Sequence, residues 1–116
     1  MHKDALSACR HELTMARSAF EDNDLDRTTH HLVRAHILGQ RHLAPHLRVH
    51  AWMLRVALCR RDLHGIAGQA LRLLLSLPGG LVSWVPLGNT GLADVPALKP
   101  MPLPADLAVY FENGRV

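Results

Sequence analysis

A short break near the middle of the chain separates two runs of apolar residues at helical spacing. The runs cover residues 25–38 and 45–61, and the break between them contains Gly39 and Pro45. Glycine commonly follows the last turn of a helix, and proline fits the first turn of the next one, where its missing N–H is not needed. Two helical runs joined by so short a connection predict an antiparallel hairpin. The rest of the chain is expected to be organised around it.

The hairpin is flanked by two more stretches with helical periodicity. Residues 4–22 form the first of them. Its apolar face gathers Leu6, Cys9, Leu13, Ala16 and Phe20. Asp24 follows this run and suits the N-cap of the next helix. The second stretch begins at Asp62 or His64 and ends before Pro78, which is followed by two glycines. We therefore expect four main helices.

The run over residues 45–61 is apolar on two sides, which predicts a central helix covered by neighbours on both. One face is expected to carry Leu47, His50, Ala51, Leu54, Ala57 and Leu58. A second face is expected to carry Trp52, Val56 and Cys59. A stripe at the edge of the first face contains His46, His50, Met53 and Ala57.

A faint internal repeat fits this layout. Asp24-Leu25 matches Asp62-Leu63, which lie 38 residues later, and several apolar positions correspond at the same offset. Ala16 and Phe20 resemble one corner of the tetratricopeptide pattern. Two such units make four helices, arranged as tetratricopeptide-like hairpins or as a bundle. Matches between apolar positions arise easily, so true repetition and chance stay open as equal alternatives.

The segment after residue 80 differs from the helical body. It is rich in proline, with Pro86, Pro96, Pro100, Pro102 and Pro104. The phrase GNTG at residues 88–91 predicts a tight turn, because Asn and Gly tolerate positive φ. Residues 99–104 predict extended, polyproline-like chain, and a short last helix is expected over residues 107–111. The many apolar residues argue against free disorder, so we expect residues 81–116 to form an ordered strap across the body, residues 1–80.

The composition is that of an ordinary globular domain. Hydrophobic residues make up 48% of the 116 residues and aromatic residues only 4%, so leucine and alanine supply most apolar contacts and favour helix. This length predicts one domain, residues 1–116. The net charge of +3 comes from 13 basic and 10 acidic residues that are interspersed along the chain. Solvated helix faces explain this pattern better than a nucleic-acid surface, so we expect no nucleic-acid partner.

No segment predicts membrane insertion or export. None approaches the ~20 consecutive apolar residues of a membrane span, and the charged N-terminus does not resemble a signal peptide. Cys9 and Cys59 lie far apart and form no CxxC pair. These features favour a cytoplasmic protein with reduced thiols and no membrane partner.

Four histidines lie in or beside the central hairpin, namely His36, His42, His46 and His50. The last three follow one another at four-residue spacing, which stacks side chains on one helix face and lets two of them chelate one ion. His36 lies on the apolar face of the preceding helix, and an antiparallel turn brings it towards the others. Neutral imidazoles suit zinc, copper or nickel, and Met53 would add a soft ligand that favours copper. The sequence therefore predicts a site for a divalent transition metal.

Other interpretations of these histidines stay open. Histidines that face a core are often structural, hydrogen-bonded to a carbonyl or a carboxylate, and a histidine-rich chain produces four-residue spacings by chance. The remaining histidines are expected at the surface: His2, His11, His30, His31 and His64. No nucleophile elbow, metal-hydrolase motif or P-loop is present. An enzyme with a histidine base therefore ranks below both a metal-binding protein and an interaction module.

Five phrases along the chain are distinctive when taken together. They are RAHILGQRH (34–42), RVHAWMLR (48–55), GQALR (68–72), VPLGNTG (85–91) and PMPLPADL (100–107). In this order they resemble the small bacterial family known as domain of unknown function 3703, and the likeness covers about residues 8–107. The resemblance carries no established activity. It implies a compact, stand-alone bacterial protein with an ordered C-terminal segment.

The same resemblance bears on the candidate site. His36, His42 and His50 fall within the shared phrases, which favours their joint role, whereas His46 falls between two of them. Further candidate binding residues are Gln40, Met53, Asn89 and Thr90.

We therefore expect an all-α fold of four main helices, arranged as two antiparallel hairpins, with an extended C-terminal strap. The leading functional hypothesis is a non-enzymatic, metal-buffering or metal-sensing protein that uses His36, His46 and His50, with His42 as a further ligand. The alternative is a helical-repeat interaction module that binds a protein partner in the groove between its hairpins or forms a homodimer.

Overall fold

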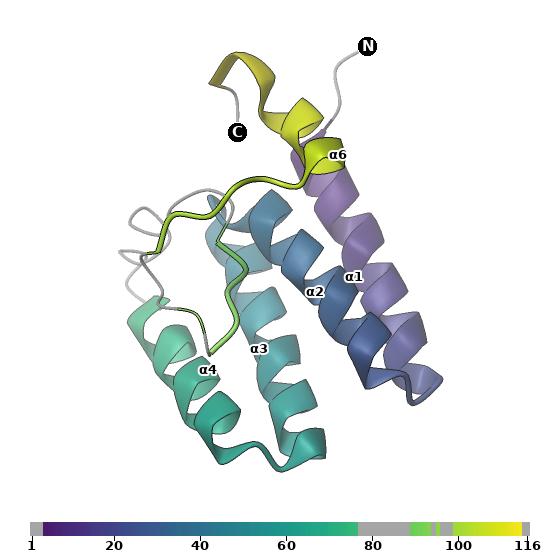
Figure 1. Cartoon of the computed structure of the whole chain (residues 1–116), viewed down its shortest axis with the longest axis vertical. Coiled ribbons are helices and arrows are strands. Elements are labelled where there is room, and N and C mark those ends of the chain that lie inside the picture. Colours follow the sequence, from purple (N-terminus) through teal and green to yellow (C-terminus); the bar gives the residue numbers. More distant parts are fainter. Residues whose placement is uncertain (1–3, 77–88, 94, 96–98, 115–116) are drawn as a thin grey trace.

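The fold is all-α, as the sequence predicts, and a computed structural model describes residues 4–76, 89–93, 95 and 99–114 of it (Figure 1). The described residues contain four main helices and no strand. The main helices are α1 (Ala5–Glu21), α2 (Leu25–Gly39), α3 (Leu43–Arg60) and α4 (Leu63–Ser76). The chain continues into a short helix, α6 (Ala105–Ala108), and a 3-10 helix, η1 (Val109–Gly114).

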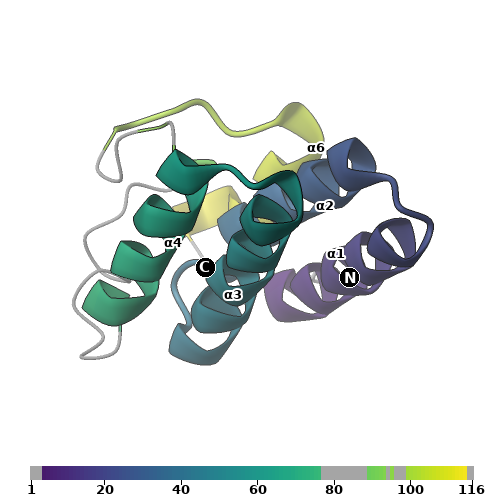
Figure 2. The ribbon, with the colours of Figure 1, turned by 90° about the horizontal axis from the view of Figure 1, so that it is seen from below.

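Each main helix packs against its neighbour in the sequence, so that α1 meets α2, α2 meets α3 and α3 meets α4. The four run in alternating directions, with α1 and α4 on the two sides and α2 and α3 between them (Figure 1). The view from below shows the same order (Figure 2). Two antiparallel hairpins side by side are compatible with a helical bundle. The central pair, α2 and α3, is covered on both sides.

Short acidic side chains mark where the helices begin. Asp4 accepts a hydrogen bond from the backbone N–H of Leu6 at 3.0 Å, and Asp24 accepts one from Arg27 at 3.0 Å. Asp62 accepts from the backbone N–H of Gly65, also at 3.0 Å. These bonds satisfy N–H groups that the first turn of a helix leaves without an internal partner. The predicted N-cap role of Asp24 is therefore confirmed.

α2 ends in a glycine, Gly39, which lets the start of α3 pack closely against the end of α2 and against α1. A Cβ atom on Gly39 would lie 2.8 Å from Sγ of Cys9 and 2.9 Å from Cβ of Pro45. Real Cβ atoms do not approach that closely, so this glycine serves close packing of the turn against α1. Pro45 lies in the first turn of α3, as the sequence predicts. The close turn holds the end of α2 beside the start of α3.

The predicted apolar faces of α3 are partly wrong. The residues that α3 buries are His46, Val49, His50, Met53, Val56 and Ala57. Ala51, Leu58 and Cys59 were expected on covered faces but are exposed, and Leu47 and Leu54 are only partly buried. The stripe expected at the edge, which contains the histidines, is instead the centre of the buried face. The stripe lies between α2 and α4, and His50 is accommodated there because the side chain of Gln69 on α4 lies opposite it.

The described part of the C-terminal segment lies against the helical body. Its residues 99–104 cross from the α4 side to α6, beside α1 (Figure 1). Pro104 has φ −55° and ψ 139°, which is polyproline-like backbone as predicted. The predicted last helix is present but begins earlier, at Ala105, and continues as 3-10 helix. Leu107 and Phe111 of this end are buried in the core. The expected strap residues 81–88 lie outside the described residues.

An ion-pair network attaches this C-terminal end to the first two helices. Arg34 of α2 donates to Glu12 of α1 at 2.7 Å and to Asp106 of α6 at 2.6 Å. Glu12 also contacts Nδ1 of His31 at 2.8 Å. His31 was expected at the surface, but its side chain is only 15% exposed because of this contact. No helix in the described part of the chain has the length and apolar character needed to cross a membrane.

Candidate metal centre

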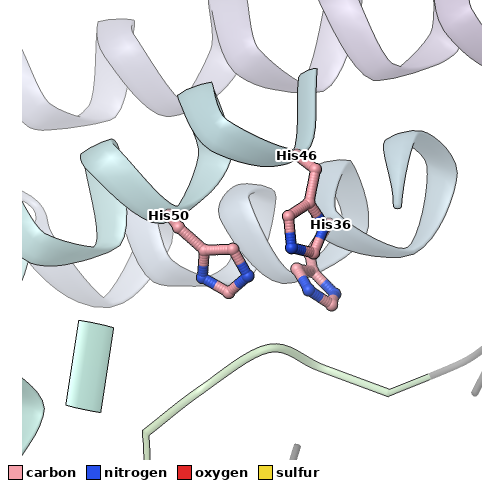
Figure 3. Close-up of side chains that lie close together, drawn as sticks. All are labelled: His36, His46 and His50. Atoms are coloured by element: carbon pink, nitrogen blue, oxygen red, sulfur yellow. The ribbon is translucent and has the colours of Figure 1, made fainter. Parts of the chain in front are cut away.

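Three imidazoles from two helices converge inside the protein (Figure 3). His36 comes from α2, and His46 and His50 come from α3. One nitrogen from each ring can be chosen so that all three atoms lie within 4.8 Å of one another. The rings are at most 1% exposed, and their centroids are 4.5 to 5.3 Å apart. This convergence is the arrangement that the sequence spacing predicts.

The local structure explains why these three rings meet. Residues four apart on a helix lie on the same face, so His46 and His50 point the same way from α3. His36 lies three residues before Gly39, where α2 ends, and the tight turn brings it back beside the first turns of α3. All three therefore occupy the space between the two helices.

His42 does not join this group, although the sequence analysis included it as a ligand. It is the N-cap residue of α3, with extended backbone at φ −123° and ψ 127°. Its side chain is partly exposed and lines a surface hollow with Cys9, Ala44 and Pro45, on the α1 side of the turn. The four-residue spacing does not carry it onto the shared face, because the helix begins only after it.

The ring of His36 is held by the C-terminal segment. Its Nδ1 lies 2.8 Å from the backbone carbonyl oxygen of Asn89. A carbonyl oxygen can only accept, so Nδ1 carries the hydrogen and donates it. In the neutral ring this leaves the lone pair on Nε2. Gly91, at φ +80°, packs on the ring so closely that a Cβ there would lie 2.6 Å from Nε2.

The ring of His50 is oriented in the same way by Gln69 of α4. The side-chain Nε2 of Gln69 donates to the carbonyl oxygen of Gly91 at 3.0 Å, which fixes the orientation of the amide. Its Oε1 therefore faces Nδ1 of His50, 2.6 Å away, and must accept a hydrogen from it. The lone pair of the neutral His50 ring is left on Nε2. Ligating histidines in metal sites are typically oriented by such a bond from the other nitrogen.

His46 is different, because neither of its ring nitrogens has a hydrogen-bond partner among the described residues. The residue is completely buried. Buried polar atoms are nearly always paired, and leaving one unpaired costs about 1–3 kcal/mol. A bound ion would satisfy the lone-pair nitrogen. His46 is thus the residue of the centre whose position is hardest to explain by packing alone.

Burial keeps the three rings neutral. It lowers the pKa of His36 well below its ordinary value, and the neighbouring rings of His50 and His46 lower it further. Burial also lowers the pKa of His46 to about 4 and that of His50 to about 4. Neutral imidazole is the form that ligates a metal. At neutral pH, therefore, an ion entering this centre displaces no proton from its ligands.

The three nitrogens of the cluster lie close enough together for one ion to reach all of them after a small inward movement. A point exists within about 2.8 Å of three atoms that are at most 4.8 Å apart. Typical Zn–N bonds are ~2.0–2.1 Å long, so each nitrogen has to move inward by at most about 0.7 Å. Small rotations of the rings supply such a shift. The donor set of three imidazoles suits zinc, copper or nickel.

Of the other candidate binding residues from the sequence, Asn89 contacts a ring of the centre, through its carbonyl oxygen and Nδ1 of His36. Gln40, Met53 and Asn89 are buried, and Thr90 is partly buried. Asn89 supports the segment over His36, because its side chain donates to the carbonyl of Lys99 at 2.8 Å and accepts from the N–H of Gly91 at 2.9 Å. Asn89 thus orients the ring of His36, a candidate ligand, through its backbone carbonyl.

Sequence reasoning missed Gln69 as a residue of the centre. A polar residue within the mostly apolar run of α4 indicates that Gln69 has a buried polar partner. The sequence did not identify that partner, because His50 lies 19 residues away along the chain. His11, His30 and His64 are exposed, as expected, and His2 lies outside the described residues.

Comparisons with known proteins identify a family but no activity. No curated protein and no solved structure matches the chain. A family model described as "Protein of unknown function (DUF3703)" matches residues 3–111, which is nearly the whole chain. The resemblance seen in the five sequence phrases is thereby confirmed, and the chain belongs to this family.

Proposed function

We propose that this protein binds one transition-metal ion, zinc, copper or nickel, through His36, His46 and His50. The observation that carries the proposal is the convergence of three buried imidazoles, with one nitrogen of each ring within 4.8 Å of the other two. Two of them are oriented through Nδ1 by partners that can only accept the hydrogen, and this leaves Nε2 as the ligand atom. Such an outer layer of hydrogen bonds is the usual support of a histidine–metal site.

A purely structural role would explain these residues less well. Structural histidines in a core are stabilised by hydrogen bonds from their ring nitrogens. His36 and His50 have such bonds, but within the described part of the chain His46 has none. The three ring centroids also lie 4.5 to 5.3 Å apart, and one nitrogen of each ring lies within 4.8 Å of the other two. A cation between these nitrogens would bind the lone pair of one of the two unpaired nitrogens of His46.

The burial of the centre favours holding an ion over catalysis. Each ligand residue is at most 1% exposed, so a substrate larger than an ion has no direct access to the centre. We therefore favour metal buffering or metal sensing over an enzymatic role. We also place this activity in the cytoplasm. Cys9 is buried and Cys59 exposed, and both are free, which suits a reducing compartment.

The direct test is metal stoichiometry in protein prepared without a histidine tag. The protein is stripped with a chelator, loaded in turn with zinc, copper or nickel, and measured by elemental analysis and thermal melting. We expect one equivalent of ion and a raised melting temperature, because ligand that binds only the folded state stabilises it. His50→Ala should abolish both effects, whereas the exposed control His30→Ala should retain them. Protein that stays metal-free and melts unchanged with every ion contradicts the proposal.

A second candidate is a protein-interaction or dimerisation role, which one feature of α4 favours. Its outer face exposes Leu63 to 80%, Leu71 to 54% and Leu74 to 63%. Contiguous exposed leucines often mark an interaction surface. Light scattering across a range of concentrations tests the homodimer, and the double substitution Leu71→Ser with Leu74→Ser should then yield monomer. This role and metal binding are compatible.

A further inference from the structure

A groove lined by arginines runs between α1 and α3, which lie on the same side of α2 (Figure 2). It consists of two hollows, of about 390 and 440 Å³, which are joined because Arg10, Leu13 and Arg48 line both of them. At the end nearer the turn between α1 and α2, Phe20 and Trp52 connect the two helices, with ring centroids 5.4 Å apart. Both arginines are exposed to solvent, so a partner can reach them.

The charged side chains that line this groove are all positive. The described residues of its lining include no aspartate or glutamate, but they include Arg10, Arg17 and Arg48. Arg48 makes no hydrogen bond or ion pair with any described residue. At the aromatic end of the groove, the guanidinium of Arg55 lies 5.0 Å from the centre of the Trp52 ring. The groove is therefore a concentration of positive charge on a protein whose net charge is only +3.

Two of these arginines have weak partners outside the groove. Arg10 donates to the hydroxyl of Ser7 at 3.2 Å, and Ser7 donates in turn to the carboxylate of Asp4 at 2.8 Å. Arg17 lies 3.9 Å from Glu21, and the two side chains are 71% and 67% exposed. Exposed ion pairs of this kind contribute little to stability. A carboxylate from a partner can therefore replace these contacts with little loss.

The arginines are arranged as two rows along the groove. Arg10 and Arg17 are seven residues apart on α1, and Arg48 and Arg55 are seven residues apart on α3. Seven residues make about two helical turns, so each pair lies on one face of its helix, ~10 Å apart along the axis. α1 and α3 run in the same direction, because successive main helices alternate (Figure 1). The two rows therefore run side by side.

The groove is apolar between its arginines, where Leu6, Leu13 and Pro45 are part of the lining. A partner that fits needs carboxylates for the arginines and apolar side chains for this surface, and an acidic protein segment offers both. Single-stranded nucleic acid instead needs open aromatic faces on which its bases stack. Trp52 is partly buried, and Arg55 already lies over its ring. The chemistry of the groove thus favours a protein partner.

We propose that this groove binds an acidic segment of a partner protein, with apolar residues between its carboxylates. The arginines hold the carboxylates in charge-assisted hydrogen bonds. The inference goes beyond metal binding, because no histidine of the metal centre lines the groove. Arg48 is two residues from both His46 and His50, and two residues turn a helix by about 200°. The groove and the centre therefore lie on opposite sides of α3.

The test begins with a selection that does not presuppose the sequence of the partner. Short random peptides displayed on phage are selected on the full chain, and an unrelated protein serves to remove non-specific binders. We expect the enriched peptides to combine several aspartates or glutamates with leucine or other apolar residues. Absence of enrichment, or enriched peptides without acidic residues, overturns the inference.

A pair of double variants then locates the binding site. The most enriched peptide is synthesised with a fluorescent label, and its affinity is measured by fluorescence anisotropy. Arg10→Gln with Arg48→Gln should weaken binding by at least about tenfold, because two charge-assisted contacts are lost. Arg60→Gln with Arg61→Gln removes the same charge from the exposed end of α3, outside the groove, and should retain the wild-type affinity. Equal weakening by both double variants overturns the inference.

A nucleic-acid partner is the competing outcome. A labelled single-stranded DNA oligonucleotide is titrated against the wild type and the same double variants. The inference expects it to bind more weakly than the selected peptide. Tighter binding of the oligonucleotide, lost on changing Arg10 and Arg48, overturns the inference and makes the groove a nucleic-acid surface. Circular dichroism confirms that each variant is folded, as expected for substitutions of exposed side chains.

Discussion

Nδ1 of His50 lies 2.6 Å from Oε1 of Gln69, and this contact determines which nitrogen of His50 faces the centre. The amide cannot be reversed without breaking its other bond, to the carbonyl of Gly91. Gln69 therefore links His50, a candidate ligand, to the C-terminal segment. His36 is linked to the same segment through Asn89. The helices that carry His36, His50 and Gln69 are thus connected to the C-terminal segment around the three rings.

Replacing Gln69 should weaken metal binding without removing a ligand. Gln69→Leu leaves the Nδ1 hydrogen of His50 without its acceptor, so the ring loses its orientation. Loss of such an outer hydrogen bond typically weakens metal affinity by about 10–100-fold. Gln69→Glu keeps an acceptor at this position and should bind more tightly than Gln69→Leu. Competition with a chelator measures both, and equal affinities for the two variants would contradict the orienting role.

Changing His46 to leucine and changing His36 to leucine should have different effects on the stability of metal-free protein. His46→Leu removes two nitrogens that lack partners within the described structure, so metal-free protein should be as stable as wild type or more stable. His36→Leu leaves the buried carbonyl of Asn89 without its donor and should lower the free energy of unfolding by about 1–3 kcal/mol. Both variants should lose metal binding. Urea unfolding with and without metal distinguishes them.

The opposite result would be informative. If His46→Leu destabilised metal-free protein as strongly as His36→Leu, His46 would have a structural role that its surroundings do not reveal. The metal site would then lose its main support from the structure.

The helices were predictable because the signals for them are local. Asp24 caps a helix through its third neighbour, and Gly39 with Pro45 marks one turn. The meeting of His36 with His46 and His50 followed from spacing plus that turn. What sequence could not supply were partners distant along the chain, such as Asn89, which is 53 residues from His36.

The incorrect predictions for the buried face of α3 and for the exposure of His31 have a related physical cause. Apolar periodicity placed one buried face of α3 on Leu47, His50, Ala51, Leu54, Ala57 and Leu58, and put the stripe that contains His46 at the edge of this face. The structure centres burial on that stripe, and for His50 a hydrogen-bonding partner on α4, Gln69, makes this burial favourable. His31 was misplaced for the same reason, because Glu12 on a different helix accepts its hydrogen bond.

Metal-free protein should lose stability as the pH falls from about 6.5 to about 4. The pKa of His46 is about 4 in the folded protein and about 6.5 when the chain is unfolded. Above pH 6.5 the ring is neutral in both the folded and the unfolded state, so it does not change the free energy of unfolding with pH. Between these values the unfolded state binds more protons, so its proton uptake favours unfolding. The burial-lowered pKa values of His50 and His36 act in the same direction.

Comparison with His46→Leu isolates the contribution of one ring. A difference of about 2.5 in pKa corresponds to at most roughly 3 kcal/mol, lost progressively across this window. The free energy of unfolding of His46→Leu should therefore fall less steeply with decreasing pH than that of wild type. Lowered carboxylate pKa values, such as that of Glu12, act at lower pH and are shared by both proteins. Parallel curves for the two proteins between pH 6.5 and 4 would contradict the assignment.

Removing the metal should loosen the C-terminal segment over the centre. The segment is bonded to two ligand-supporting groups, through the Asn89 carbonyl to His36 and the Gly91 carbonyl to Gln69. An ion that fixes the rings also fixes these acceptors, so opening of the segment requires more free energy in loaded protein. The backbone amides of Gly91 and Leu92, which are bonded within the segment, should then exchange with solvent more slowly.

Hydrogen exchange with and without bound metal measures this effect. The amide of Asn23, in the turn between α1 and α2, serves as a control because that turn contains none of the three histidines or their partners. We expect slower exchange at Gly91 and Leu92 in loaded protein and no change at Asn23. A uniform slowing at all three would indicate a general gain in stability, and unchanged exchange at Gly91 would show that the segment and the centre are uncoupled. Only the local pattern agrees with a metal centre whose occupancy is transmitted to the surface through Asn89 and Gln69.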